Sequence, residues 1–199
     1  MLKLYKRLGG IIMNSKYYRL VLCAIAIAIN IVLGNIVAAF QVPFLFLDAV
    51  GTIFIALIFG PIAGLTVGLL TNLVAPMLMG NFAFSPFMIV SVAIGLVAGV
   101  MFKKMKFKST SMIIIGIVVA FIAAFIGSGV KLVVFGGYSG EILDSVFALL
   151  TGAGLNDFIA TFIPRFAYNI VDKILSCYMV YILYNKLVKS KVSMPNVNV

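Results

Sequence analysis

Long apolar segments, separated by short polar ones, alternate along the whole chain. A helix needs about 20 apolar residues to cross the roughly 30 Å of hydrocarbon in a bilayer. The pattern therefore predicts an all-α integral membrane protein, a compact bundle of six transmembrane helices of which the second is the shortest. The predicted spans are about 17–40, 47–59, 61–79, 86–102, 111–135 and 164–187.

The connections between the predicted spans are short except for the last. Gly60 and Pro61 form a breaker typical of a tight turn directly before a helix start. Residues 136–163 are mixed in character, and we expect an external loop with a short helix there. The predicted organisation is a basic N-terminal segment (1–16), a membrane domain (17–188) and a polar tail (189–199).

Composition supports a membrane protein with no separate catalytic domain. Hydrophobic residues make up 64% of the 199-residue chain and charged residues only 10%, whereas a soluble domain is about half apolar and about a quarter charged. So few charges cannot keep this much apolar side chain in water, so lipid must cover it. The length allows one bundle and little more.

The basic residues orient the predicted bundle. Three clusters contain 12 of the 15 Lys and Arg residues, and with six spans all three fall on one side. The positive-inside rule then places both termini in the cytoplasm, with four of the five acids on the other side. Topology and anionic lipid thus explain the net charge of +10, and we expect no nucleic-acid binding. The clusters are Lys3, Lys6, Arg7, Lys16 and Arg19; Lys103, Lys104, Lys106 and Lys108; and Lys186, Lys189 and Lys191.

No residue pattern indicates catalysis, a cofactor or a metal site. The chain has no histidine, which is the commonest general base and metal ligand. Its glycines lie in apolar helices without the Gly-Lys-Ser/Thr sequence of a phosphate-binding loop. Cys23 and Cys177 lie inside apolar segments, which favours core cysteines over a disulfide. We expect a non-enzyme that takes energy from a partner or from an ion gradient.

Polar residues inside membrane spans are costly and therefore informative. The sixth predicted span carries five of them at offsets of 0, 4, 7, 8 and 11, which is one face of a helix. This face must point to the bundle interior or to a water-filled cavity. It either forms an internal ion pair that fixes helix packing or contacts a bound substrate. The residues are Arg165, Asn169, Asp172, Lys173 and Ser176.

Two further residues near the outer face are candidates for substrate contact. Lys131 either snorkels to the outer head groups or shares an anionic ligand with Arg165. Tyr168 either stacks on a ring of the ligand or fills space. The positive excess of the set weakly favours a ligand with a carboxylate or phosphate and a polar ring. The charges concerned are Lys131, Arg165 and Lys173 against Asp172 and Asp48.

Buried amides and small residues have both a packing and a functional interpretation. Asn30, Asn35 and Asn72 either contact the ligand or form hydrogen bonds between helices. Asp48 begins the second helix, where we expect it to act as the N-cap. Glycines spaced by four allow close internal helix packing. These glycines are Gly60, Gly64 and Gly68 in one span and Gly95 and Gly99 in the next.

The sequence resembles the substrate-binding S components of energy-coupling factor (ECF) importers. The resemblance is clearest in LDAVGTIFIALIFGPIAGLTVGLLTNLVAPML, from Leu47 to Leu78, which joins a short apolar span to a Gly-rich one through Phe59-Gly60-Pro61. It extends over nearly the whole chain. Ala24 and Ala28, in an alanine strip with Ala26, are similar to the motif with which the family contacts its transmembrane coupling subunit. An outward-facing strip would be such a docking surface.

This resemblance implies a function. An S component holds a vitamin or related small nutrient at the outer face of the bacterial cell membrane, beneath loops that here are about 40–47 and 80–85. It associates with a coupling subunit and two cytoplasmic ATPases, and it is thought to topple to release its cargo. The lack of histidine excludes the nickel and cobalt members. The lack of tryptophan excludes indole stacking on a thiamine-like or flavin-like ring.

Two alternatives remain open from the sequence. A stand-alone secondary transporter commonly shows inverted repeats or broken helices around charges at the membrane midplane. Here no repeat is visible, and the charges cluster on one helix. A ligand-sensing membrane domain is disfavoured because the chain ends about a dozen residues after the last predicted span.

Overall fold

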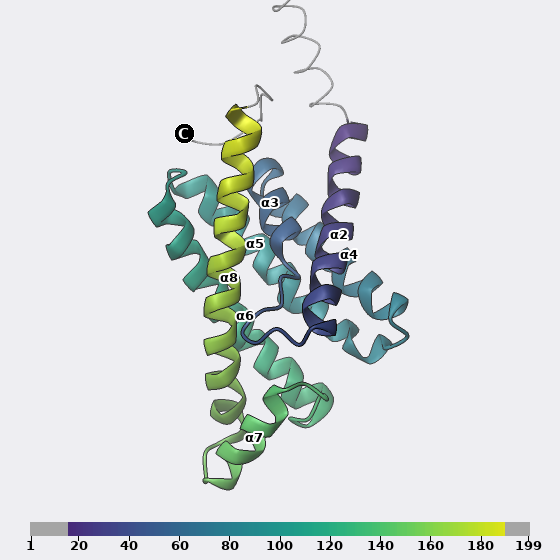
Figure 1. The fold of residues 1–199 in the computed structure, drawn as a ribbon, viewed down its shortest axis with the longest axis vertical. Helices are drawn as coiled ribbons and strands as arrows, with labels where there is room; N and C mark the ends of the chain where they lie inside the picture. Colours follow the sequence, from purple (N-terminus) through teal and green to yellow (C-terminus); the bar gives the residue numbers. More distant parts are fainter. Residues whose placement is uncertain (1–15, 190–199) are drawn as a thin grey trace, which may run out of the picture.

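The computed structural model describes residues 16–189, and every regular element in that range is helical (Figure 1). Five segments are long and apolar enough to cross a membrane, namely α2, α4, η1 with α5, α6 and α8. The predicted basic residues Lys3, Lys6, Arg7 and Lys191 lie outside the described residues. The elements are α2 (Lys16–Ala39), α3 (Val50–Phe59), α4 (Pro61–Leu78), the 3-10 helix η1 (Phe82–Phe87), α5 (Met88–Lys104), α6 (Ser109–Phe135), α7 (Leu143–Gly152) and α8 (Asp157–Lys189).

The predicted second span is shorter than expected and begins later. Helix α3 has 10 residues, or about 15 Å at helical rise, which is half of a hydrocarbon core. Residues 40–49 before it are non-helical, and three of them, Gln41, Phe44 and Leu47, have φ of 47°, 62° and 51°. This left-handed backbone cannot continue a helix. Irregular backbone at membrane depth requires protein around it or a cavity beside it, and both are present here.

The predicted start of the last span at Pro164 is wrong. Helix α8 begins at Asp157 and continues through Pro164. The Asn156 side chain accepts a hydrogen bond from the N–H of Phe158 at 2.9 Å, which satisfies a donor of the first turn. A proline inside a helix removes one backbone bond, and packing in a membrane bundle compensates for it. The short helix expected within 136–163 is present as α7.

Glycines bring the backbones of α4 and α5 into contact, as their spacing predicts. A Cβ on Gly95 would lie 2.4 Å from the carbonyl carbon of Gly64, and one on Gly68 would lie 2.4 Å from the Ser91 oxygen. A similar contact joins α2 to α3, where a Cβ on Gly51 would lie 2.3 Å from the Ala26 oxygen. These helices therefore pack without intervening side chains.

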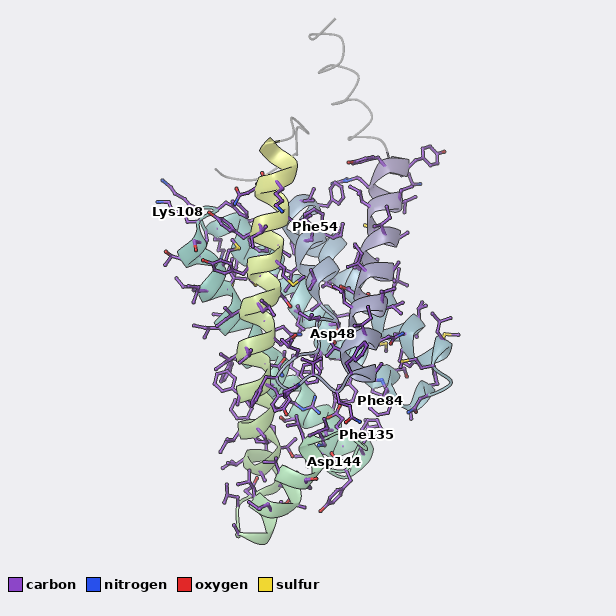
Figure 2. The ribbon with its side chains drawn as sticks, in the orientation of Figure 1. Asp48, Phe54, Phe84, Lys108, Phe135 and Asp144 are labelled. Carbon is purple, nitrogen blue, oxygen red and sulfur yellow. The ribbon has the colours of Figure 1, made fainter. Side chains whose placement is uncertain are left out.

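The two ends of the bundle differ in charge and in packing. Figure 1 shows the start of α2 and the end of α8 at one end and α7 at the other. Lys108 lies toward the former and Asp144 toward the latter (Figure 2). We call them the Lys108 end and the α7 end. A buried apolar cluster extends from mid-bundle toward the Lys108 end and includes Cys177, which is a free cysteine.

Candidate functional site

The polar stripe of α8 faces the bundle interior, as its spacing predicts. Its five side chains are all more than nine-tenths buried, and Asp172 and Ser176 are fully enclosed. Glycine makes room for the largest of them, since a Cβ on Gly127 of α6 would lie 3.3 Å from the Arg165 side chain. The stripe therefore contacts protein or cavity along its length.

Two neighbouring cavities lie beside this stripe. The larger has a volume of about 600 Å³ and the smaller about 180 Å³. They share five lining residues, so they are parts of one site. Figure 2 shows two of them, Asp48 and Phe84, between mid-bundle and the α7 end. The shared residues are Phe46, Asp48, Asn72, Phe84 and Glu141.

Most of the predicted substrate contacts line these cavities, and two do not. Lys131 and Asp172 line neither cavity. The residues at the larger cavity are Asn30, Asn35, Asn72 and Tyr168, and those at the smaller are Asn72, Arg165, Asn169 and Lys173.

Asp172 fixes the loop between α2 and α3. Its Oδ1 accepts hydrogen bonds from the backbone N–H groups of Phe46 at 2.9 Å and Leu47 at 2.8 Å. Its Oδ2 lies 2.5 Å from Lys173 Nζ. The carboxylate is therefore fully used by the protein, and it holds the left-handed turn at Leu47 against α8. Asp172 thus positions the loop that forms part of a cavity wall, without lining a cavity itself.

Asp48 is an ion-pair partner, and the prediction that it caps α3 is wrong. The cap position is Ala49, and no side chain caps the helix. Asp48 Oδ1 instead accepts a hydrogen bond from Lys173 Nζ at 3.1 Å, while its side chain remains 40% exposed. Lys173 thus joins two carboxylates, Asp48 at the cavity surface and Asp172 behind it.

Arg165 connects α8 to the segment before α7. Its Nη2 donates to Glu141 Oε2 at 2.7 Å, and its guanidinium lies 5.3 Å from the centroid of the Phe87 ring. Its Nε–H has no hydrogen-bond partner among residues 16–189. Glu141 lines both cavities, and the sequence reasoning did not select it. The only sequence feature that pointed to Glu141 was its position among the four acids on the predicted outer side of the membrane.

Lys131 neither snorkels nor reaches the ligand site. Its side chain is 1% exposed and forms an ion pair with Asp144 at 2.5 Å. Burial raises the pKa of the Asp144 carboxyl, but the hydrogen bonds from Lys131 and from the Gly140 N–H, with the Lys131 charge, outweigh burial and hold this pKa below its ordinary value of 3.8. This pair anchors α7 to α6.

The four predicted amides have different roles. Asn30 is fully buried and joins three helices, because it donates to Thr52 and Thr71 and accepts from the Gly51 N–H. Asn72 donates to Ser91 at 2.6 Å and also lines both cavities. Asn169 donates to the Arg165 carbonyl. Asn35 forms no hydrogen bond with any described residue, so its whole amide is available at the larger cavity.

Aromatic rings complete the cavity walls. Tyr168 packs on Phe44 with centroids 4.5 Å apart and on Phe46 at 6.2 Å. It therefore holds the loop 40–49 as Asp172 does, and it also lines the larger cavity. On the opposite wall, Phe84 of η1 packs against Phe135 at 5.1 Å. Two separate segments thus present aromatic surface to the cavities.

The charge balance predicted for the site is wrong. The expected excess of cations disappears because each cation is paired with at least one acid. The predicted charge balance did not include Glu141 and Asp144, whose ion-pair partners lie 24 and 13 residues away in sequence. Among residues 16–189 no group of three or more His, Cys, Asp or Glu residues could hold a metal ion. The arrangement suits recognition of an organic molecule.

A second feature lies on the outside of α2. Ala24 and Ala28 are exposed, whereas Ala26 between them is buried against α3. Two of the three predicted alanines thus form an outward strip, flanked by the exposed apolar residues Val21, Ile25 and Ile29.

Comparison with known families agrees with this architecture. The sequence model of the family described as "ECF transporter, substrate-specific component" matches residues 18–184. The chain has no match among curated proteins or among solved structures. The family match covers all residues that line the two cavities and all or most of each of the five long helices. The protein therefore belongs to the family of substrate-specific components of ECF transporters.

Proposed function

We propose that this protein captures a vitamin or related small nutrient at the outer face of the bacterial cell membrane, as the specificity subunit of an ATP-driven ECF importer. The observation that carries the proposal is the 600 Å³ cavity, with aromatic, amide and carboxylate groups on its walls. Its volume falls within the range of about 300–1,000 Å³ typical of small-molecule sites. Family membership adds substrate-specific transport as the context.

The proposed orientation places the α7 end outside the cell. Lys103, Lys104 and Lys108 then lie on the cytoplasmic side with both ends of the chain, as the positive-inside rule requires. Residues 40–49 and α3 together form one more membrane crossing, between α2 and α4, in addition to the five long helices. This places the irregular loop beside the cavity, where bound substrate and protein rather than lipid surround its backbone.

The proposed partners are a transmembrane coupling subunit and two cytoplasmic ATPases, which supply the hydrolysis that this chain does not carry out. The outward strip of Ala24 and Ala28 is the proposed contact with the coupling subunit. Small side chains there allow a partner helix to approach the α2 backbone closely. The apolar residues around them would be buried by the same partner.

The capture function is tested by the small molecules that accompany the protein. The full chain is purified in a non-ionic detergent, and bound compounds are released and identified by mass spectrometry. We expect one vitamin-like compound at near 1:1 stoichiometry that rebinds in a titration. A protein that is empty and recruits neither a coupling subunit nor an ATPase would contradict the proposal and favour a stand-alone transporter or a sensing domain.

The coupling contact has a matched test within one helix. Ala24→Leu and Ala28→Leu enlarge exposed positions, so cargo binding should persist while co-purification of the coupling subunit falls at least about tenfold. Ala26→Leu enlarges a buried position and should instead reduce the yield of folded protein. Unchanged co-purification in the first two variants would remove the strip from the interface.

A further inference from the structure

The charged groups of the site are unequally divided between its two cavities. Among the described residues, the only charged side chains that line the larger cavity are the carboxylates of Asp48 and Glu141. The cations Arg165 and Lys173 line only the smaller one. A ligand in the larger cavity therefore meets negative charge without a facing cation.

The two carboxylates are also better placed to bind a ligand than their partners are. The side chains of Asp48 and Glu141 are 40% and 27% exposed, against 2% for Lys173 and 8% for Arg165. Each carboxylate uses one oxygen in its ion pair, Oδ1 of Asp48 and Oε2 of Glu141. The other oxygen accepts no hydrogen bond from residues 16–189. Because a carboxylate accepts up to about four hydrogen bonds, each can bind a ligand donor without losing its ion pair.

An anionic ligand would meet the opposite situation. Lys173 is already neutralised by Asp48 and Asp172, and Arg165 by Glu141. An anion in the larger cavity would lie beside two partly exposed carboxylates, whose repulsion is reduced but not removed by the cation paired with each. Binding to either cation would require it to displace a protein carboxylate.

An independent observation in the smaller cavity indicates a second ligand group. The Arg165 side chain is more than nine-tenths buried, yet its Nε–H has no hydrogen-bond partner among the described residues. Buried donors are nearly always paired. Arg165 lines this cavity, but its Nε is covered by protein atoms, so a ligand acceptor beside the guanidinium satisfies this donor only when the side chain shifts.

We propose that the cargo is a cationic, ring-bearing small molecule that also carries a neutral hydrogen-bond acceptor. Its positive group contacts the free oxygens of Asp48 and Glu141. Its ring lies against Phe46 and Phe84, which line both cavities. Its acceptor lies beside the Arg165 guanidinium in the smaller cavity. The inference rests on the proposed function only in taking this site as the cargo site.

Three probes of one shape and different charge test the proposal. Benzamidine, benzamide and benzoate carry charges of +1, 0 and −1 on the same ring, and their dissociation constants are measured on the cargo-depleted full chain in a non-ionic detergent at neutral pH. We expect benzamidine to bind at least about tenfold more tightly than the other two, because only it combines hydrogen-bond donors with a positive charge opposite the carboxylates. Equal or tighter binding of benzoate, or no binding of benzamidine, would overturn the proposal.

Variants assign the preference to the two carboxylates. Asp48→Asn and Glu141→Gln keep the side-chain shape and remove one charge, so each should weaken benzamidine binding about tenfold. Asp157→Asn is the matched control, because it removes the same charge at an exposed residue that lines neither cavity. Unchanged affinity in both cavity variants would overturn the assignment.

The outcome separates this inference from the proposed function. The ranking of the probes is measured on the wild-type protein, so a variant that fails to fold does not remove the test. An anionic cargo found by mass spectrometry would keep the capture function and overturn the inference. A protein without cargo or partners that still prefers benzamidine would overturn the capture function and keep the inferred preference of the site for a cation.

Discussion

The Lys108 half and the α7 half of the bundle are held together in different ways. Toward the Lys108 end, apolar side chains such as Met112, Ile115 and Val180 are fully buried, and glycines bring helix backbones into contact. Toward the α7 end, ion pairs such as Lys131–Asp144 and Arg165–Glu141 connect α6 and α8 to α7 and to the segment before it. The cavities lie in this second half.

The difference follows from what each half must do. Close packing leaves no room for a ligand, and closely packed side chains hold one another in place without directional contacts. A cavity removes packing, so the surrounding segments need directional contacts to stay in place. Asp172 illustrates this, since one carboxylate fixes two loop N–H groups and a lysine. The tightly packed half supports helices, and the polar half supports loops.

Removing the Asp172 carboxylate should give the largest effect. Asp172→Ala leaves Lys173 in a buried site with only the partly exposed Asp48, and it frees the N–H groups of Phe46 and Leu47. Breaking a buried pair in this way costs about 3–5 kcal/mol. We expect a lower thermal midpoint in detergent and fast hydrogen exchange in residues 40–49.

A milder variant at the same position separates charge from loop support. Asp172→Asn keeps an oxygen that can accept from the two loop N–H groups, so exchange in residues 40–49 should be intermediate. Hydrogen exchange in this loop that is the same in wild type and in Asp172→Ala would contradict the assigned role. The loop would then be held by Tyr168 and its aromatic contacts alone.

Two glycine substitutions compare a tight helix contact with an open position. A Cβ on Gly95 would lie 2.4 Å from Gly64, whereas one on Gly129 of α6 meets nothing within 4 Å. Gly95→Ala should therefore destabilise the fold by about 1–3 kcal/mol through overpacking. Gly129→Ala should be neutral or stabilise it by up to about 1 kcal/mol, because alanine is the better helix former. Thermal denaturation of both variants decides, and equal midpoints would contradict the contrast.

Features that depend on local periodicity could be predicted from the sequence. The long helices, the interior face of α8 and the glycine contacts all follow from spacing within one or two segments. The extent of the loop 40–49 could not, because its left-handed residues are not glycines. They are held by Asp172 and Tyr168, more than 120 positions later in the chain.

The candidate site was predictable only in part for the same reason. Spacing along α8 identified Arg165, Asn169 and Lys173, which line the smaller cavity. It could not identify their partners, because an ion pair such as Arg165–Glu141 joins a helix to a loop whose path the sequence does not specify. Without Glu141, the site looked cationic. The sign of the site's net charge was therefore the feature that the sequence predicted least reliably.

The smallest expected effect is a pH dependence confined to the α7 end. The folded-state pKa of Asp144 lies below its ordinary value of 3.8, so the ionised carboxylate stabilises α7 above about pH 4. This contribution is lost as pH falls below 3.8 through the folded-state value. Because Asp144 is partly exposed, we expect a change of less than about 1 kcal/mol. Hydrogen exchange in residues 140–152, corrected for the intrinsic pH effect, measures it.

The matched variant isolates this carboxylate from the other acids. The informative quantity is therefore the difference between wild type and Asp144→Asn. The variant should exchange faster in residues 140–152 at neutral pH and lose this difference from wild type below about pH 3.8. Amides of α4 and α5 should show no such difference, because glycine contacts rather than charges hold those helices. A difference that extended to α4 and α5 would mean that the two halves unfold as one unit, and the contrast between them would describe packing but not stability.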